Sequence, residues 1–119
     1  MNVWLFIAAL NGFIAVAAGA FAAHGLQGRL DAHALSIFET AAHYQMYHAL
    51  ATGIAALASR TSASQLACAA FLAGIVLFSG SLYLLALSGA RILAFVTPLG
   101  GVAFLAGWLA LAWSAARTH

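Results

Sequence analysis

Long apolar stretches constrain this chain more than any other feature of its sequence. They cover residues 3–23, 41–58, 66–87 and 95–116, and each is close to the roughly 20 residues that a helix needs to cross a bilayer. Within lipid every backbone N–H and C=O must be paired inside the protein, so helices are the economical way to cross. The pattern therefore predicts an all-α fold, a bundle of four transmembrane helices.

The composition supports a membrane location. Of the 119 residues, 66% are hydrophobic and only 5% are charged, whereas soluble domains carry about 25% charged residues. A soluble domain this short could not bury so much apolar surface. We therefore expect a single integral membrane domain over residues 1–119, with the lipid bilayer as its partner. Four arginines oppose only Asp31 and Glu39, so the basic face of a nucleic-acid-binding protein is missing.

Two connecting segments have distinctive sequences. Residues 24–40 mix Arg29, Asp31 and Glu39 with spaced apolar residues, which predicts a short interfacial helix that runs into the second span. Asp31 would lie near the N-terminus of this helix, where an anion is favoured. The segment Thr97–Gly101 contains the only proline, Pro98. Because proline is tolerated best in a first helical turn, we expect the fourth helix to break or restart there.

The polar residues are distributed unevenly between the two sides of the membrane. Four spans put both termini on one side, with Arg60 and Arg117, while Arg29 and Arg91 fall on the other. This tie gives no orientation by the positive-inside rule. Most other polar residues lie in the half away from the termini. The candidates for a polar cluster or ligand site there are His24, Glu39, Tyr44, Gln45, His48, Ser79, Ser81, Tyr83 and Arg91.

The densest polar stretch runs from Glu39 to His48. Glu39 and His43 are spaced to share one helix face, and Tyr44 and His48 form a second such pair. At ~1.5 Å per residue, His48 lies about 13 Å beyond Glu39 and so within the membrane. Polar side chains at that depth usually face the bundle interior or a wet cavity.

This stretch has two interpretations. Imidazole and carboxylate groups can bind a transition metal or move protons, and His24, His48 and Glu39 are the candidate ligands. Alternatively, His48 ties the bundle together by hydrogen-bonding across helices to Ser79 or Asn11. We favour the second interpretation, with no metal, no cofactor and no assigned catalytic residue, because no metal-binding or nucleophile motif surrounds these side chains.

Small residues and one repeated motif bear on helix packing. Pairs of small residues four apart occur in every span, which favours close helix contacts in a compact bundle and leaves a homo-oligomer open. One from each span is Ala15/Gly19, Ala49/Gly53, Ala70/Gly74 and Ala103/Gly107. The sequence Phe-Leu-Ala-Gly occurs at 71–74 and again at 104–107. Two copies are fewer than a repeat architecture needs, so we interpret the recurrence as a coincidence of composition.

Four segments in order resemble the small bacterial membrane proteins of the DUF423 family, also called UPF0382, which include the transmembrane protein 256 relatives. They are Gly19–Leu26, Glu39–Leu50, Leu77–Tyr83 and Thr97–Trp108. The resemblance implies four transmembrane helices, the bacterial inner membrane and two cytoplasmic termini, and it implies no activity. Ala22 stands where the family usually has glycine. The position of His43 varies in the family, which leaves His24 and His48 as the better metal candidates.

Taken together, these patterns predict a non-enzymatic membrane protein that acts as a structural, accessory or lipid- or small-ligand-binding component. One alternative is a membrane enzyme or metalloprotein that uses His24, Glu39 and His48. Another is a small oligomeric channel or transporter, although the sequence lacks the paired broken helices typical of transporters.

Overall fold

The computed structural model describes residues 1–58 and 60–117, and these form four helical rods. The first two rods are single helices. The third contains a π-helical turn, and the fourth opens with a 3₁₀ segment, Arg91–Phe95. The α-helices are α1 (Val3–His24), α2 (Ala32–Ala58), α3 (Ser62–Gly74), α4 (Gly80–Ser88) and α5 (Thr97–Ala116), with the π-helical turn Ile75–Ser79 between α3 and α4. The predicted all-α class is confirmed.

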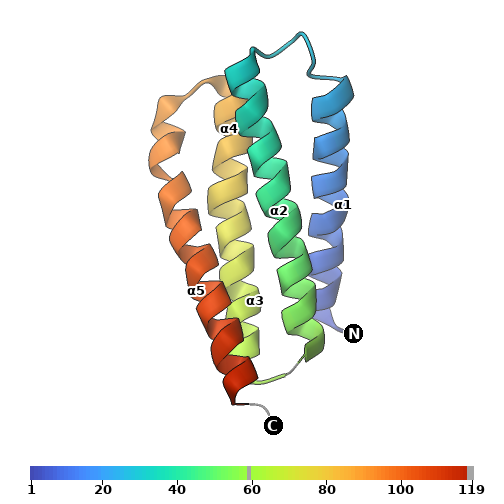
Figure 1. The fold of residues 1–119 in the computed structure, drawn as a ribbon, viewed down its shortest axis with the longest axis vertical. Coiled ribbons are helices and arrows are strands. Elements are labelled where there is room, and N and C mark those ends of the chain that lie inside the picture. The colour runs from blue at the N-terminus through green and yellow to red at the C-terminus, as the bar shows by residue number, and fades with distance from the viewer. Residues whose placement is uncertain (59, 118–119) are drawn as a thin grey trace.

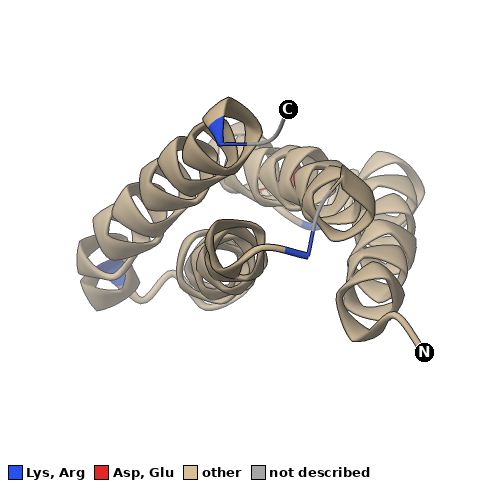
Figure 2. Cartoon of the chain, turned by 90° about the horizontal axis from the view of Figure 1, so that it is seen from below, with Lys and Arg blue, Asp and Glu red and all other residues tan. Residues whose placement is uncertain are grey.

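The rods run up and down side by side, so that Met1 and the end of α5 lie at the same end of the bundle (Figure 1). We call this end the terminal end. The closest packing is between α1 and α2 and between α3 and α5, and α2 joins the two pairs. The molecule measures 52 × 26 × 19 Å. Viewed from the terminal end, α1 stands at one side and packs mainly on α2 (Figure 2).

Helix α2 begins nine residues earlier than the apolar stretch that predicted it. The Asp31 carboxylate accepts a hydrogen bond from the Ala34 N–H at 2.8 Å and caps the helix, as an anionic N-cap should. No glycine or proline interrupts the chain from Ala32 to Thr52, so the polar first turns and the apolar stretch belong to one helix, which ends at Ala58. The residues of the expected interfacial helix are therefore the first turns of α2. They run into the second span, as predicted, but they form no element of their own.

Three of the rods are long and apolar enough to cross a membrane. They are the first, third and fourth: Val3–His24, Ser62–Ser88 and Arg91–Ala116. The fourth rod restarts as an α-helix at Thr97, with Pro98 in its first turn, as predicted. Helix α2 carries the polar stretch that includes Glu39, Gln45 and His48, and it is not one of the three. That α2 is a fourth transmembrane helix remains a prediction.

The two copies of Phe-Leu-Ala-Gly meet where α3 packs on α5. The Phe71 ring lies against Gly107, where an added Cβ would come within 2.6 Å of its ring carbons. The Phe104 ring lies equally tightly against Gly74 in return. Each phenylalanine thus occupies the space that the glycine of the other copy leaves open. The recurrence is therefore a packing motif of two antiparallel helices, and the interpretation as coincidence is wrong.

The same seam continues towards the other end of the bundle. Gly100 lies against the backbone of Phe78, and Ser81 and Thr97 share a hydrogen bond of 2.6 Å between their hydroxyls. Every step of three or four residues along one rod is matched by an equal step back along the other. The hydrophobic effect does not drive helices together in lipid. Close backbone packing at small residues, as in this register, takes its place.

The predicted small-residue contacts form on three of the four rods. Gly74 and Gly107 belong to the seam, and a Cβ on Gly53 would lie 3.8 Å from Ala8 of α1. Gly19 is different, since nothing lies within 4 Å of an added Cβ there. The core divides into two clusters, one towards each end of the bundle. Ala51, Ala55, Ala67, Cys68, Phe71 and Ala110 form the first, and Ala22, Leu26, Phe38 and Ala86 form the second.

Candidate functional site

A chain of hydrogen bonds crosses the middle of the bundle through Gln45, whose side chain is only 4% exposed. Tyr83 of α4 donates its hydroxyl hydrogen to Gln45 Oε1 at 2.8 Å. Gln45 Nε2 donates to Asn11 Oδ1 of α1 at 2.9 Å. Asn11 Nδ2 in turn donates to the Ile7 carbonyl at 3.0 Å. Three helices are therefore joined by side chains within their apolar interior.

The direction of this chain follows from its last member. A carbonyl oxygen can only accept, so the Asn11 atom beside the Ile7 oxygen must be the amide nitrogen. Asn11 Oδ1 is then the acceptor for Gln45 Nε2, which leaves Gln45 Oε1 to accept from Tyr83. Asn11 thus forms a bond between helices, with Gln45 as its partner. An amide pair in lipid costs little only when both of its ends are satisfied in this way.

His48 has partners on both ring nitrogens. Its Nδ1 lies 2.8 Å from the Tyr44 carbonyl, one turn back in α2, and the Trp108 indole of α5 donates to its Nε2 at 3.1 Å. The carbonyl can only accept and the indole N–H can only donate, so this arrangement fits the neutral tautomer with hydrogen on Nδ1. The predicted cross-helix bond exists, but its partner is Trp108 rather than Ser79 or Asn11.

Aromatic rings enclose the His48 imidazole, which is 5% exposed. The Phe104 ring stacks on it with 3.5 Å between ring centroids and 7° between planes. Phe71 lies at 5.6 Å and Tyr44 at 6.2 Å, measured in the same way. A metal ion on Nε2 would have to displace Trp108 and enter a space that these rings already fill.

The other ionisable candidates are not gathered around His48. His24 is exposed at the end of α1, Glu39 is half-buried on α2, and Arg91 is exposed at the start of the 3₁₀ segment. Within residues 1–58 and 60–117, no ion pair joins Arg91 to Glu39 or Asp31. The same residues contain no group of three His, Cys, Asp or Glu side chains that could hold a metal ion.

The two serine candidates have different surroundings. The Ser81 hydroxyl donates to the Phe78 carbonyl at 2.9 Å and bonds to Thr97 across the seam. Ser79 closes the π-helical turn and is fully buried, and its hydroxyl has no hydrogen-bond partner among the described residues. Tyr44 packs against Phe78, with 4.7 Å between ring centroids.

Five of the nine predicted site residues fall into three groups: Gln45 with Tyr83, His48 with Tyr44, and Ser81 at the seam. The other four, His24, Glu39, Ser79 and Arg91, belong to none of these groups. Sequence reasoning missed Trp108, which was not among the candidates for the polar cluster. Its spacing of four from Phe104, which puts both on one helix face, was the signal that could have linked it to the stretch on α2.

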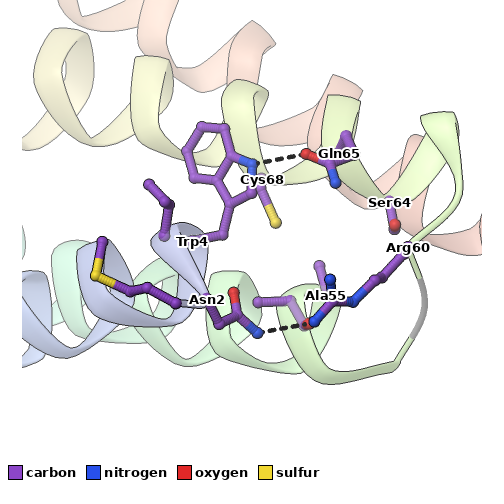
Figure 3. A pocket seen from close by; sticks show the side chains of 10 residues that line it. Asn2, Trp4, Ala55, Arg60, Ser64, Gln65 and Cys68 are labelled. Atoms are coloured by element: carbon purple, nitrogen blue, oxygen red, sulfur yellow. Dashed lines mark hydrogen bonds between the residues drawn. The ribbon is translucent and has the colours of Figure 1, made fainter.

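A second polar feature lies at the terminal end, between the first turns of α1 and α3. It is a pocket of about 220 Å³ into which the Arg60 side chain extends (Figure 3). Trp4 donates its indole N–H to Gln65 Oε1 at 2.9 Å, and Asn2 Nδ2 donates to the Ala56 carbonyl at 3.2 Å. None of these side chains was among the sequence candidates, because Arg60 stood in a short polar turn without a motif.

Apolar grooves border α1 on two sides. One, of about 380 Å³, lies between α1 and α2 and includes Gly12 and Gly53. The other, of about 480 Å³, lies between α1 and α4, with Phe13, Ala17 and Phe21 on α1. Tyr83 lines this second groove, although its hydroxyl is bonded to Gln45.

Comparison with known proteins identifies relatives over almost the whole chain. Residues 18–101 match the family described as "Protein of unknown function (DUF423)". The chain is 47% identical to a UPF0382 membrane protein of Staphylococcus aureus over 93% of both chains. It is 44% identical to one of Haemophilus influenzae, over 98% of this chain and 96% of that one.

The UPF0382 membrane protein YwdK of Bacillus subtilis is 43% identical, over 98% of both chains. No solved structure matches the chain. The motifs of the sequence, the helices of sufficient length and the relatives agree. The chain belongs to the DUF423 family of membrane proteins.

Proposed function

We propose that the protein is a non-enzymatic accessory component of the bacterial inner membrane that binds lipid beside α1. The observation that carries this proposal is the groove of about 480 Å³ between α1 and α4. The groove is open along the side of the bundle, and its walls are apolar. A groove of this kind among membrane-crossing helices suits a lipid acyl chain, because lipid is what surrounds the helices there.

A catalytic role finds less support in the same geometry. Both nitrogens of His48 are engaged, by Tyr44 and by Trp108. The amide of Gln45 is engaged at both ends as well. These groups stabilise the helix packing, and a general base or nucleophile would need to face a substrate instead.

The proposal includes a topology with α2 as the fourth span and both termini in the cytoplasm. Helix α2 lies alongside the three apolar rods (Figure 1), and its polar Gln45, His48 and Thr52 are buried. Cysteines at positions 33 and 117, in a Cys68→Ala background, test this arrangement. An impermeant thiol reagent added outside the cell should label position 33 alone. Labelling of position 117 alone would mean that the orientation is the opposite one, with both termini outside. Labelling of both positions would refute α2 as a fourth span.

Lipid binding is tested by filling the groove. Ala17 lines the groove, whereas Ala20 is an exposed residue of the same helix that lines none of the grooves described above. We expect Ala17→Phe to lower the amount of phospholipid that remains with the detergent-purified protein, measured by mass spectrometry. Ala20→Phe should leave it unchanged. Equal phospholipid in the two variants and the wild type would refute the groove as a lipid site.

A further inference from the structure

A pocket at the membrane boundary carries an inference beyond the apolar grooves. We propose that the pocket between the first turns of α1 and α3 binds a phosphate-bearing anion, with Arg60 as the charged partner. The proposal deepens the proposed function, since the headgroup of an anionic phospholipid is one source of such an anion. The pocket and the groove have no lining residue in common, so an experiment can refute one of the two sites and leave the other standing.

The charged side chain that lines the pocket is positive. Arg60 is the only charged side chain among the described residues that line it. The chain has only two acidic residues, Asp31 and Glu39, and both belong to the other end, around the start of α2. In the part of the chain that the structure describes, Arg60 forms no ion pair. Its guanidinium therefore presents a fork of donors that matches a phosphate group and lacks a protein anion.

Neighbouring groups add further donors. Gln65 accepts from Trp4 through its Oε1, so its amide nitrogen keeps two N–H donors for a ligand. Asn2 and Thr61 are the N-caps of α1 and α3, so the positive ends of two helix dipoles lie beside the pocket. These contributions strengthen the attraction of an anion that Arg60 would hold. Figure 3 shows Asn2, Trp4, Arg60 and Gln65 around the same space.

The dimensions and the position of the pocket narrow the ligand. About 220 Å³ is less than the roughly 300 Å³ at which sites for drug-sized molecules begin, so the pocket suits a headgroup or a small phosphate compound. It lies at the end of the apolar rod α1, where a bilayer meets water. Trp4 forms one wall, and tryptophan is enriched at the level of lipid headgroups.

The test compares two arginines of the same membrane side. Arg60→Gln removes the charge in the pocket. Arg117→Gln removes an equal charge from the end of α5, where Arg117 Cζ lies 5.6 Å from the centroid of the Trp113 ring and outside the pocket. Binding of phosphatidylglycerol to the detergent-purified full chain is measured by native mass spectrometry, with phosphatidylcholine as the zwitterionic comparison.

We expect Arg60→Gln to weaken phosphatidylglycerol binding about tenfold, the effect of losing one charged hydrogen-bonding partner. Arg117→Gln should change it less than about twofold, since exposed charges at a distance are screened. Arg60→Lys should recover part of the loss, because it keeps the charge without the fork. Melting temperatures of all variants should match, because Arg60 is exposed. Equal effects of Arg60→Gln and Arg117→Gln would overturn the proposal.

A competition experiment separates the two sources of the anion. Inorganic phosphate at millimolar concentration that displaces phosphatidylglycerol from the wild type, and not from Arg60→Gln, would identify a site for free phosphate. Retention of the lipid would identify a headgroup site. If Ala17→Phe reduces bound lipid while Arg60→Gln has no specific effect, the groove stands and the pocket fails. The reverse pattern refutes the groove alone.

Discussion

Gly100 offers a direct test of the seam between the third and fourth rods. A Cβ at this position would lie 2.7 Å from both Cα and Cβ of Phe78 and still closer to its backbone nitrogen. The obstacle is therefore main chain, which cannot rotate away as the end of a side chain can. The next residue, Gly101, is a matched control. A Cβ there would meet only Phe78 Cδ2, at the ordinary contact distance of 4.0 Å.

The two substitutions share one favourable contribution to the free energy of unfolding, and only one of them has an unfavourable contribution. Replacing glycine by alanine within a helix gains about 1 kcal/mol from propensity, and this applies to both positions because both lie in the first turns of α5. Overpacking against a rigid neighbour costs about 1–3 kcal/mol, and only Gly100→Ala incurs it. We therefore expect Gly100→Ala to be less stable than Gly101→Ala by about 1–3 kcal/mol.

The assay is unfolding of the detergent-solubilised protein by titration with sodium dodecyl sulfate, followed by tryptophan fluorescence. Gly101→Ala should unfold at or slightly above the wild-type midpoint, and Gly100→Ala clearly below it. Coincident midpoints for the two variants would mean that the rods do not approach at Gly100. That result would refute the register in which the third and fourth rods pack along the whole seam.

Two predictions concern the polar groups inside the bundle, and both are read by the same titration. Gln45→Leu leaves Tyr83 and Asn11 without their partner, so we expect a loss of about 1–3 kcal/mol, whereas Tyr83→Phe, which removes only one donor, should cost less; equal losses would contradict a linked chain. Trp108→Phe keeps an aromatic ring beside His48 but removes its donor, and we expect a loss of about 1 kcal/mol. In a His48→Phe background, Trp108→Phe should cause no such loss. A loss as large as in the wild type would mean that the indole stabilises the protein through another contact.

Local rules were sufficient for several features of the fold. The apolar stretches located all four rods, and Pro98 located the restart of the fourth, because each depends on residues adjacent in the chain. Asp31 fixed a helix start for the same reason. The error at this point was to divide one continuous helix into an interfacial part and a spanning part. A change of hydropathy does not end a helix when neither glycine nor proline interrupts it.

The partners of the polar side chains could not be read in this way. His48 and Trp108 are 60 residues apart in the sequence, but Trp108 Nε1 lies 3.1 Å from His48 Nε2. This contact depends on the order of the rods in the bundle and on their register. The π-helical turn Ile75–Ser79 changes the register of everything that follows it in the third rod. Its sequence is ordinary for an apolar helix, so no local signal marks it.

Helix α1 connects the two proposals. It packs mainly on α2. Among the described residues, its polar ties to other helices are the bond from Gln45 to Asn11 in the middle of the bundle and the bonds of Asn2 and Trp4 near the terminal end. Both the groove and the Arg60 pocket have α1 as a wall. A lipid bound at either place would therefore add contacts to a rod that packs mainly on one protein neighbour. The seam on the other side of the bundle differs, because backbone meets backbone there at Gly100 and Phe78.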